Sequence, residues 1–158
     1  MAKTLDAVLV GCGGMSGAWL KVIQEIPSVR IVGLVDVLEE NARRRREEFG
    51  LTGAEVGSEL DPMLRLKRPD LVLDCTVPSA HVGVTLTALR RGCHVLGEKP
   101  MAETLADARR MVAAARRANR IYAVIQNRRY LNGINRFRNT LHNKHLGVIN
   151  TVCADFRI

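Results

Sequence analysis

The chain has 158 residues, of which 47% are hydrophobic, 25% are charged and 4% are aromatic. This length and composition suffice for one domain of ordinary size with a buried core. No apolar run approaches the roughly 18 residues that a membrane span requires, and the N-terminus lacks a signal-peptide pattern. The sequence therefore predicts a cytoplasmic protein with no membrane partner.

The net charge of +8 and the pI near 9.9 raise the question of nucleic-acid binding. Most of the excess is arginine in doublets and short runs within predicted helices, and few aromatic residues accompany it to stack on bases. We interpret these arginines as solvated helix faces and expect no nucleic-acid partner. They are Arg43 to Arg46, Arg90-Arg91, Arg109-Arg110 and Arg116-Arg117.

The cysteines show no metal-binding or redox spacing. Cys12, Cys75, Cys93 and Cys153 contain no C-x-x-C pair, and three of them lie in or beside predicted strands. In a cytosolic chain this pattern is typical of reduced, mostly buried thiols, so we predict neither a disulfide framework nor a metal site.

In chain order, short apolar runs alternate with helical patterns separated by a few residues. Such alternation predicts parallel strands with right-handed crossovers, that is, an α/β fold with a doubly wound, Rossmann-type sheet. Strands are expected over residues 6–10, 30–36, 54–56, 71–75, 94–97 and 121–126, and helices over 15–26, 38–49, 59–67, 80–91 and 104–119.

A glycine cluster separates the first strand from the first helix. Gly11, Gly13 and Ser16 occupy the three positions of the Gly-x-Gly-x-x-small fingerprint, and Gly14 and Met15 lie between them. In that fingerprint the first glycine makes the turn, the second allows close approach of a pyrophosphate, and the third position must be small. Glycine clusters also occur in ordinary turns, so the match needs support from the rest of the chain.

That support comes from Asp36, which ends the second predicted strand. An acidic residue at this place accepts hydrogen bonds from the adenosine ribose, and it repels a 2′-phosphate. The sequence therefore predicts NAD as the cofactor, with NADP less favoured. The Arg43 to Arg46 run argues the other way, but it begins seven residues further on.

Three later stretches resemble the Gfo/Idh/MocA oxidoreductases, the family of glucose–fructose oxidoreductase and inositol dehydrogenase. They are Thr76-Val77-Pro78-Ser79-Ala80-His81, Gly92-Cys93-His94-Val95-Leu96-Gly97-Glu98-Lys99-Pro100 and Asn127-Arg128-Arg129-Tyr130. The resemblance implies that Lys99 assists proton transfer during hydride chemistry at an alcohol or ketone. It also implies positions near the cofactor or the lysine loop for Thr76, Pro78, His81, Glu98, Asn127 and Arg128 (or Arg129).

A bottom-up argument supports the same grouping, because ligands bind parallel sheets beyond the carboxyl ends of the strands. Asp36, Thr76, Lys99 and Asn127 all follow predicted strands. For Lys99 the alternative is an ordinary solvated lysine. For His81 it is a packing or capping residue in the first helical turn.

Members of this family run to more than twice this length. We expect residues 1–130 to form the NAD-binding domain, and 131–158 to form a linking helix over 135–143 and the first strand of a truncated substrate domain. Such a fragment would bind NAD but not turn over, and its unpaired strand would favour homo-oligomers.

The resulting prediction is the cofactor-binding part of an NAD-dependent oxidoreductase acting on a sugar, polyol or related hydroxy compound. The alternative from another class is a non-catalytic NAD-binding module, acting as a sensor or a partner subunit.

Overall fold

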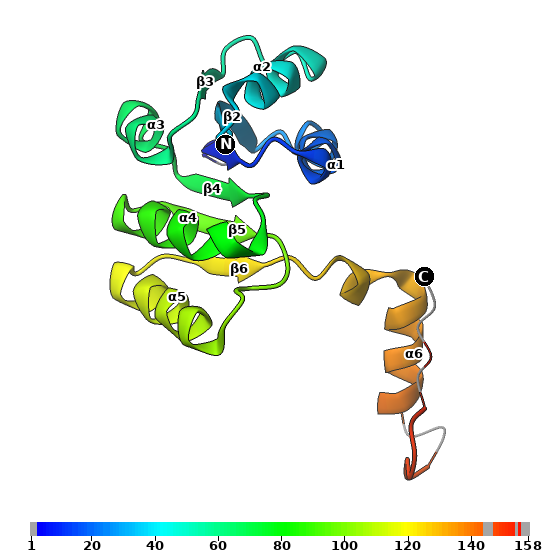
Figure 1. The fold of residues 1–158 in the computed structure, drawn as a ribbon. Coiled ribbons are helices and arrows are strands. Elements are labelled where there is room, and N and C mark those ends of the chain that lie inside the picture. The colour runs from blue at the N-terminus through cyan, green and yellow to red at the C-terminus, as the bar shows by residue number, and fades with distance from the viewer. Residues whose placement is uncertain (1–2, 144–146, 154, 156–158) are drawn as a thin grey trace. The chain divides into compact units, whose positions relative to one another are not determined.

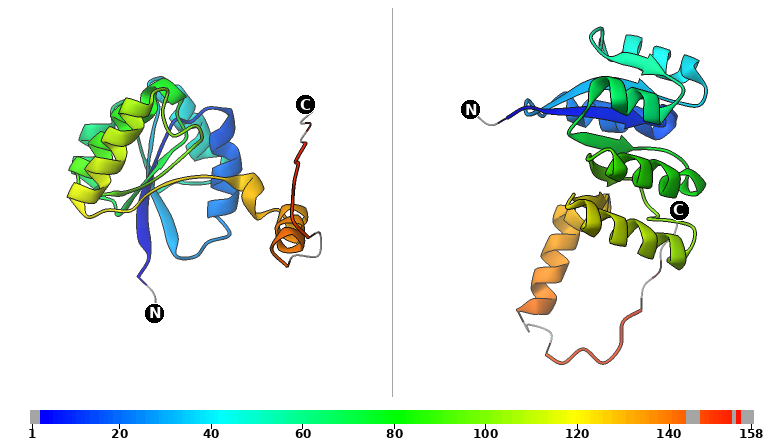
Figure 2. Two further views of the ribbon diagram at one scale, coloured as in Figure 1. Left: turned by 90° about the horizontal axis from the view of Figure 1, so that it is seen from below. Right: turned by 90° about the vertical axis from the view of Figure 1, so that its left-hand side faces the viewer.

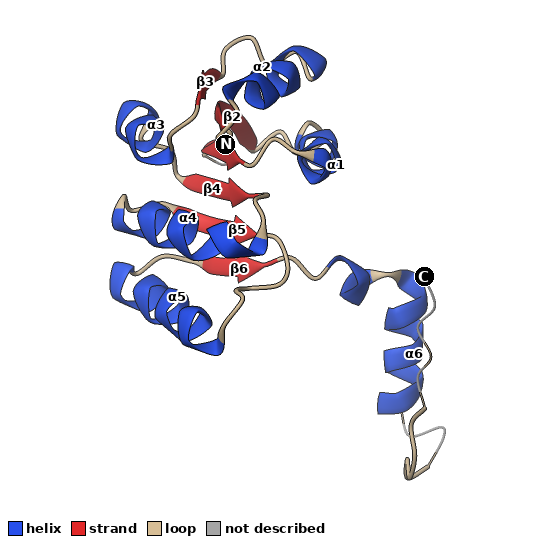
Figure 3. Ribbon diagram, viewed as in Figure 1, coloured by secondary structure: helices blue, strands red, loops and turns tan. Residues whose placement is uncertain are grey.

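The computed structural model describes residues 3–143, 147–153 and 155. The chain divides into two compact units, Met1–Ile125 and Gln126–Ile158. The first unit alternates strands with helices along the chain (Figure 3). Within the described ranges, no helix combines the length and apolar character needed to cross a lipid bilayer.

The first unit is built on one parallel sheet, which confirms the predicted doubly wound fold. In the described part of the chain its order is β3-β2-β1-β4-β5-β6 (Figure 1). The order reverses between β1 and β4, where a doubly wound sheet forms its ligand crevice. The strands are β1 (Leu5–Val10), β2 (Val29–Val35), β3 (Glu55–Gly57), β4 (Leu71–Asp74), β5 (His94–Gly97) and β6 (Tyr122–Val124).

Helices cover both faces of this sheet (Figure 2). One apolar cluster joins the strands to α1 and α2 through Trp19, Leu20 and Ala42, and a second joins them to α3, α4 and α5 through Leu64, Leu89 and Ala115. Because both faces are covered, the central strands read as continuous apolar runs. The helices of this unit are α1 (Gly14–Ile23), α2 (Glu39–Glu48), α3 (Leu60–Lys67), α4 (Pro78–Arg90) and α5 (Leu105–Ala118).

Element boundaries differ from the predicted ones by a few residues. The first helix ends at Ile23 rather than residue 26, because the Ile26 N–H closes a tighter turn on the Ile23 carbonyl. The fourth begins at Pro78, two residues early, since proline is well tolerated in the first helical turn. At α5, the predicted cap forms as expected: the Thr104 hydroxyl accepts from the Asp107 N–H at 3.1 Å.

The second unit contains a short 3₁₀ helix, η1 (Asn127–Tyr130), and α6 (Asn132–His142). A helix therefore forms where the linking helix was predicted, beginning three residues earlier than expected. The strand predicted near the C-terminus does not: residues 147–153 have no strand conformation, and the described part of this unit offers no strand to pair with. Residues 144–146, 154 and 156–158, over which that prediction also extended, lie outside the described residues.

Candidate functional site

The glycine turn, Gly11 to Ser16, connects β1 to α1 at the edge of the sheet where the strands end, here called the carboxyl edge. Gly11 has φ +86°, and a Cβ added to it would lie 2.7 Å from the Cys75 carbonyl carbon. Its N–H donates to the Val35 carbonyl oxygen at 2.8 Å. Only glycine fits this position, because a side chain would be strained by the backbone and would collide with the end of β4.

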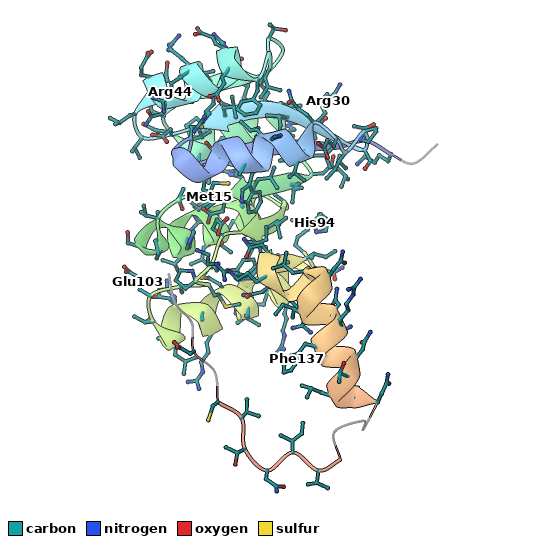
Figure 4. All side chains as sticks on the ribbon, turned by 90° about the vertical axis from the view of Figure 1, so that its right-hand side faces the viewer. Met15, Arg30, Arg44, His94, Glu103 and Phe137 are labelled. Atoms are coloured by element: carbon teal, nitrogen blue, oxygen red, sulfur yellow. The ribbon has the colours of Figure 1, made fainter. Side chains whose placement is uncertain are left out.

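The following residues of the turn face open space. Gly13, Gly14 and Met15 are exposed, and a Cβ added at either glycine would meet nothing within 4 Å. They form the N-terminus of α1, where backbone N–H groups lack intrahelical partners and the helix dipole favours an anion. Figure 4 shows Met15 and Arg44 toward the carboxyl edge, with Arg30 and His94 toward the opposite edge. An exposed helix N-terminus with bare glycines fits a pyrophosphate.

Asp36 follows β2 directly and holds the turn from the side. Its Oδ2 accepts from the Cys12 N–H at 2.7 Å, and its Oδ1 accepts from the Leu38 N–H at 2.9 Å and from Asn41 Nδ2 at 3.2 Å. A carboxylate has about four acceptor positions, so these three bonds leave capacity for a ribose hydroxyl. The sequence predicted Asp36 at the end of the second strand, and the structure places it directly after β2, but its bond to the turn was not predicted.

A buried polar cluster lies at the end of β4. Asp74 and His81 are 1% and 2% exposed, and Asp74 Oδ2 lies 3.0 Å from His81 Nδ1. Asp74 Oδ1 accepts from the Thr76 N–H at 3.0 Å and from the Thr76 hydroxyl at 2.6 Å. His81 is therefore a buried partner of Asp74 that fixes the Thr76 loop. Pro78, also predicted to be at the site, is exposed and begins α4.

Lys99 follows β5 at the same edge and is exposed. The preceding carboxyl group, Glu98, is buried, and its two oxygens have protein partners: Oε1 accepts from the Trp19 indole N–H at 2.8 Å and Oε2 from the Lys99 N–H at 3.1 Å. The lysine loop is thus tied to α1, the helix that the glycine turn begins. The Lys99–Pro100 peptide bond is cis.

The prediction that the Arg43 to Arg46 run is a solvated helix face is wrong for Arg45. The side chain of Arg43 is 51% exposed, whereas that of Arg45 is only 13% exposed. Arg45 reaches from α2 to the glycine turn, where Nη2 donates to the Gly13 carbonyl oxygen at 2.8 Å and Nε to Ser16 Oγ at 3.0 Å.

The two cysteines near the site are free thiols, Cys12 buried and Cys75 partly buried. Burial, with a smaller contribution from the Asp36 charge, raises the pKa of the Cys12 thiol to about 12. Burial also raises the pKa of Cys75. Because the thiolate is the nucleophile, these neutral thiols serve as packing residues at the carboxyl edge. The structure describes no group of three or more His, Cys, Asp or Glu side chains placed to hold a metal ion.

Asn127 and Arg128, the remaining predicted site residues, belong to the second unit. Both lie exposed in η1, where the Arg128 N–H donates to Asn127 Oδ1 at 2.9 Å. Their role at the site stays a prediction.

Three neighbouring features converge on the carboxyl edge of the first unit: a bare glycine turn, an acid at the end of β2 and an exposed lysine after β5. Together with the doubly wound sheet they define a dinucleotide-binding domain. Comparison with known proteins agrees: residues 5–126 match the model of the oxidoreductase family with an NAD-binding Rossmann fold, and the chain belongs to this Gfo/Idh/MocA family.

Individual relatives are similar over most of this chain. D-apiose dehydrogenase of Paraburkholderia graminis is 33% identical over 128 residues, covering 81% of this chain and 34% of its own. D-glucoside 3-dehydrogenase of Escherichia coli is 32% identical over 126 residues, covering 80% and 35%. The solved WlbA dehydrogenase of Bordetella pertussis, in complex with NADH and UDP-GlcNAcA, has the same fold, with TM-score 0.86 at 24% identity over 93% of this chain and 42% of its own.

The chain thus spans about a third of the length of these two curated relatives. Within that span it is an NAD-binding Rossmann domain of an oxidoreductase family. Sequence reasoning missed Asp74, Trp19 and Arg45. A signal existed for Asp74, an acid ending an otherwise apolar strand, whereas Trp19 reads as an ordinary core residue on its helix.

Proposed function

We propose that this domain serves hydride transfer between NAD and the hydroxyl-bearing carbon of a sugar, polyol or related compound. The observation that carries the proposal is the exposed Lys99, held at the carboxyl edge by the buried Glu98 and tied through Trp19 to the helix of the glycine turn. Relatives named as dehydrogenases of D-apiose, D-glucosides and myo-inositol support this substrate class.

The chain's own residues would divide the work. The exposed N–H groups of Gly14 and Met15 would bind the pyrophosphate, and Asp36 would accept from the adenosine ribose. NAD, when bound, supplies the hydride acceptor, and NADH the donor. Lys99 Nζ would take the proton released when an alcohol is oxidised and return it when a carbonyl is reduced. The buried His81 would position the Thr76 loop, and the buried Glu98 would position the lysine loop.

The carboxylate of Asp36 supports NAD over NADP, because a 2′-phosphate would place negative charge beside it. A cytoplasmic location, a homo-oligomer formed through a second-domain sheet, and the assignment of residues 131–158 to the start of a substrate domain stay predictions from the sequence.

The test joins this chain to a substrate domain and follows the absorbance of reduced nicotinamide with D-apiose, a D-glucoside and myo-inositol. Replacing Lys99→Ala should lower turnover by roughly 10²–10⁴-fold, the usual contribution of a positioned acid or base. NAD affinity should change much less, since the phosphates bind elsewhere. Lys21→Ala, which removes an exposed lysine from α1, is the charge-matched control.

Near-normal turnover in Lys99→Ala would remove that lysine from the mechanism. If NAD binds but no member of the substrate panel is oxidised or reduced, the non-catalytic NAD-binding module is the better description.

A further inference from the structure

We propose that Arg45 is a positioning residue for the pyrophosphate, acting by fixing the peptide between Gly13 and Gly14. Arg45 Nη2 donates to the Gly13 carbonyl oxygen at 2.8 Å, and its Nε donates to Ser16 Oγ at 3.0 Å. The guanidinium also pairs with Glu48 at 2.5 Å, so a residue of its own helix orients it. The proposal rests on the proposed binding of NAD at the glycine turn.

Ser16 and Arg45 converge on one carbonyl oxygen. Ser16 occupies the third position of the glycine fingerprint and is fully buried, and its hydroxyl donates to the Gly13 carbonyl oxygen at 2.6 Å. The helix start has no side-chain cap of its own, because its N-cap residue is Gly13. The side chains of Arg45 and Ser16 thus fix this helix start by hydrogen bonds, which Gly13 cannot do because it has no side chain.

The consequence for an anion follows from peptide geometry. In a planar trans peptide the C=O and the following N–H point in opposite directions. Holding the Gly13 carbonyl toward the body of α1 and α2 therefore directs the Gly14 N–H outward, into the open space at the helix N-terminus. Preorganised donors bind more tightly, because the ligand does not have to order them.

Asp36 holds the turn two peptides earlier, at the Gly11–Cys12 peptide, through the Cys12 N–H at 2.7 Å. The segment from the end of β2 into α2 therefore clamps two peptides of the turn, with a carboxylate on a donor and a guanidinium on an acceptor. Charge-assisted bonds of this kind are roughly twice as strong as neutral ones. All three guanidinium nitrogens of Arg45 donate to protein acceptors, which favours positioning over direct contact with the ligand.

The experiment titrates the purified chain with NAD, ADP-ribose and AMP at fixed ionic strength. Arg45→Ala should lower the affinity for NAD and for ADP-ribose about tenfold, which corresponds to the loss of about one charge-assisted hydrogen bond. AMP, which lacks a pyrophosphate, should bind within twofold of its wild-type affinity. Ser16→Ala should weaken NAD in the same direction, and adding Arg45→Ala to it should cost less than the sum of the two changes.

Arg43→Ala on the same helix and Arg109→Ala on α5 remove one exposed positive charge each and should leave all three affinities within twofold. Arg45→Lys keeps the charge but not the fork of donors, so it should bind NAD nearly as weakly as Arg45→Ala. This variant also provides a second test should Arg45→Ala fold poorly by circular dichroism.

Wild-type affinity for NAD in Arg45→Ala would overturn the role of Arg45 alone. An equal loss for AMP would overturn it too, because it would indicate general destabilisation. Wild-type affinity for NAD in Arg45→Lys would also overturn the positioning role, because it would show that only the positive charge is needed. A wild-type chain that binds neither NAD nor ADP-ribose would instead overturn the proposed function.

Discussion

At the scale of single residues, two glycines of the same turn are required for different reasons. Gly11 has no room for a Cβ, because the carbonyl carbon of Cys75 would lie 2.7 Å away. Gly13 has room, since a Cβ there meets nothing within 4 Å. We infer that the ligand occupies the open space beside Gly13.

This difference predicts separable effects of two alanine variants. Gly11→Ala should lower the free energy of unfolding by about 2 kcal/mol or more, through overpacking and a backbone conformation that alanine rarely adopts. Gly13→Ala should leave stability within about 0.5 kcal/mol but weaken NAD by about tenfold or more, because its methyl group would meet the pyrophosphate. Denaturant unfolding and calorimetry measure the two quantities.

Gly53→Ala, also in open space but remote from the turn in sequence, is the matched control and should change neither quantity by much. If Gly13→Ala binds NAD as tightly as the wild type, the pyrophosphate does not lie against this part of the turn.

At the scale of elements, β4 and α4 are joined by the buried Asp74–His81 pair. Both side chains are almost fully buried, and the described residues offer no partner to His81 Nε2. Removing one member of a buried pair leaves the other without compensation, which costs about 3–5 kcal/mol. The pair therefore fixes the Thr76 loop, and the loss of either member alone should destabilise the domain.

We expect Asp74→Ala and His81→Ala each to lower the free energy of unfolding by about 3 kcal/mol. The double variant should lose clearly less than the sum, because its second change removes an unpaired group. Arg43→Ala, which breaks an exposed ion pair with Glu39, should cost less than about 1 kcal/mol. Chemical denaturation of all four variants tests this, and additive losses would show that the two side chains act independently.

The sequence predicted elements better than it predicted the contacts between them. Alternating apolar runs located the strands and helices of the first unit, and Asp36 was found from its place after β2. The Trp19–Glu98 bond links residues 79 apart, so no local pattern indicates it. The role of Arg45 is not predicted, because a charged run on a polar helix resembles a solvated face. Only its contacts with the glycine turn distinguish Arg45 from the neighbouring arginines.

The strand expected near the C-terminus failed for a different reason. A run rich in valine and isoleucine favours strand conformation, but a strand needs a neighbour for its backbone hydrogen bonds. The described part of the second unit contains no strand, so residues 147–153 have no sheet to join there. Association through that strand edge accordingly has no support from these residues.

At the scale of the whole molecule, part of the net positive charge comes from arginines placed at the C-terminal ends of helices. The last turns of α2, α3, α4 and α5 all carry arginine, where cations complement the helix dipole. The acidic Asp36 and Asp74 lie instead at the carboxyl edge, next to the glycine turn. Positive charge is thus spread over the helix ends of the first unit.

We propose above all that the first unit binds NAD at the glycine turn with Asp36 against the adenosine ribose. Calorimetric titration of the 158-residue chain with NAD and with NADP, at matched ionic strength, tests it most directly. We expect saturable binding at one site per chain, tighter for NAD than for NADP. Absence of NAD binding would contradict the claim, and equal or tighter NADP binding would show that the arginines following Asp36 determine the choice of cofactor.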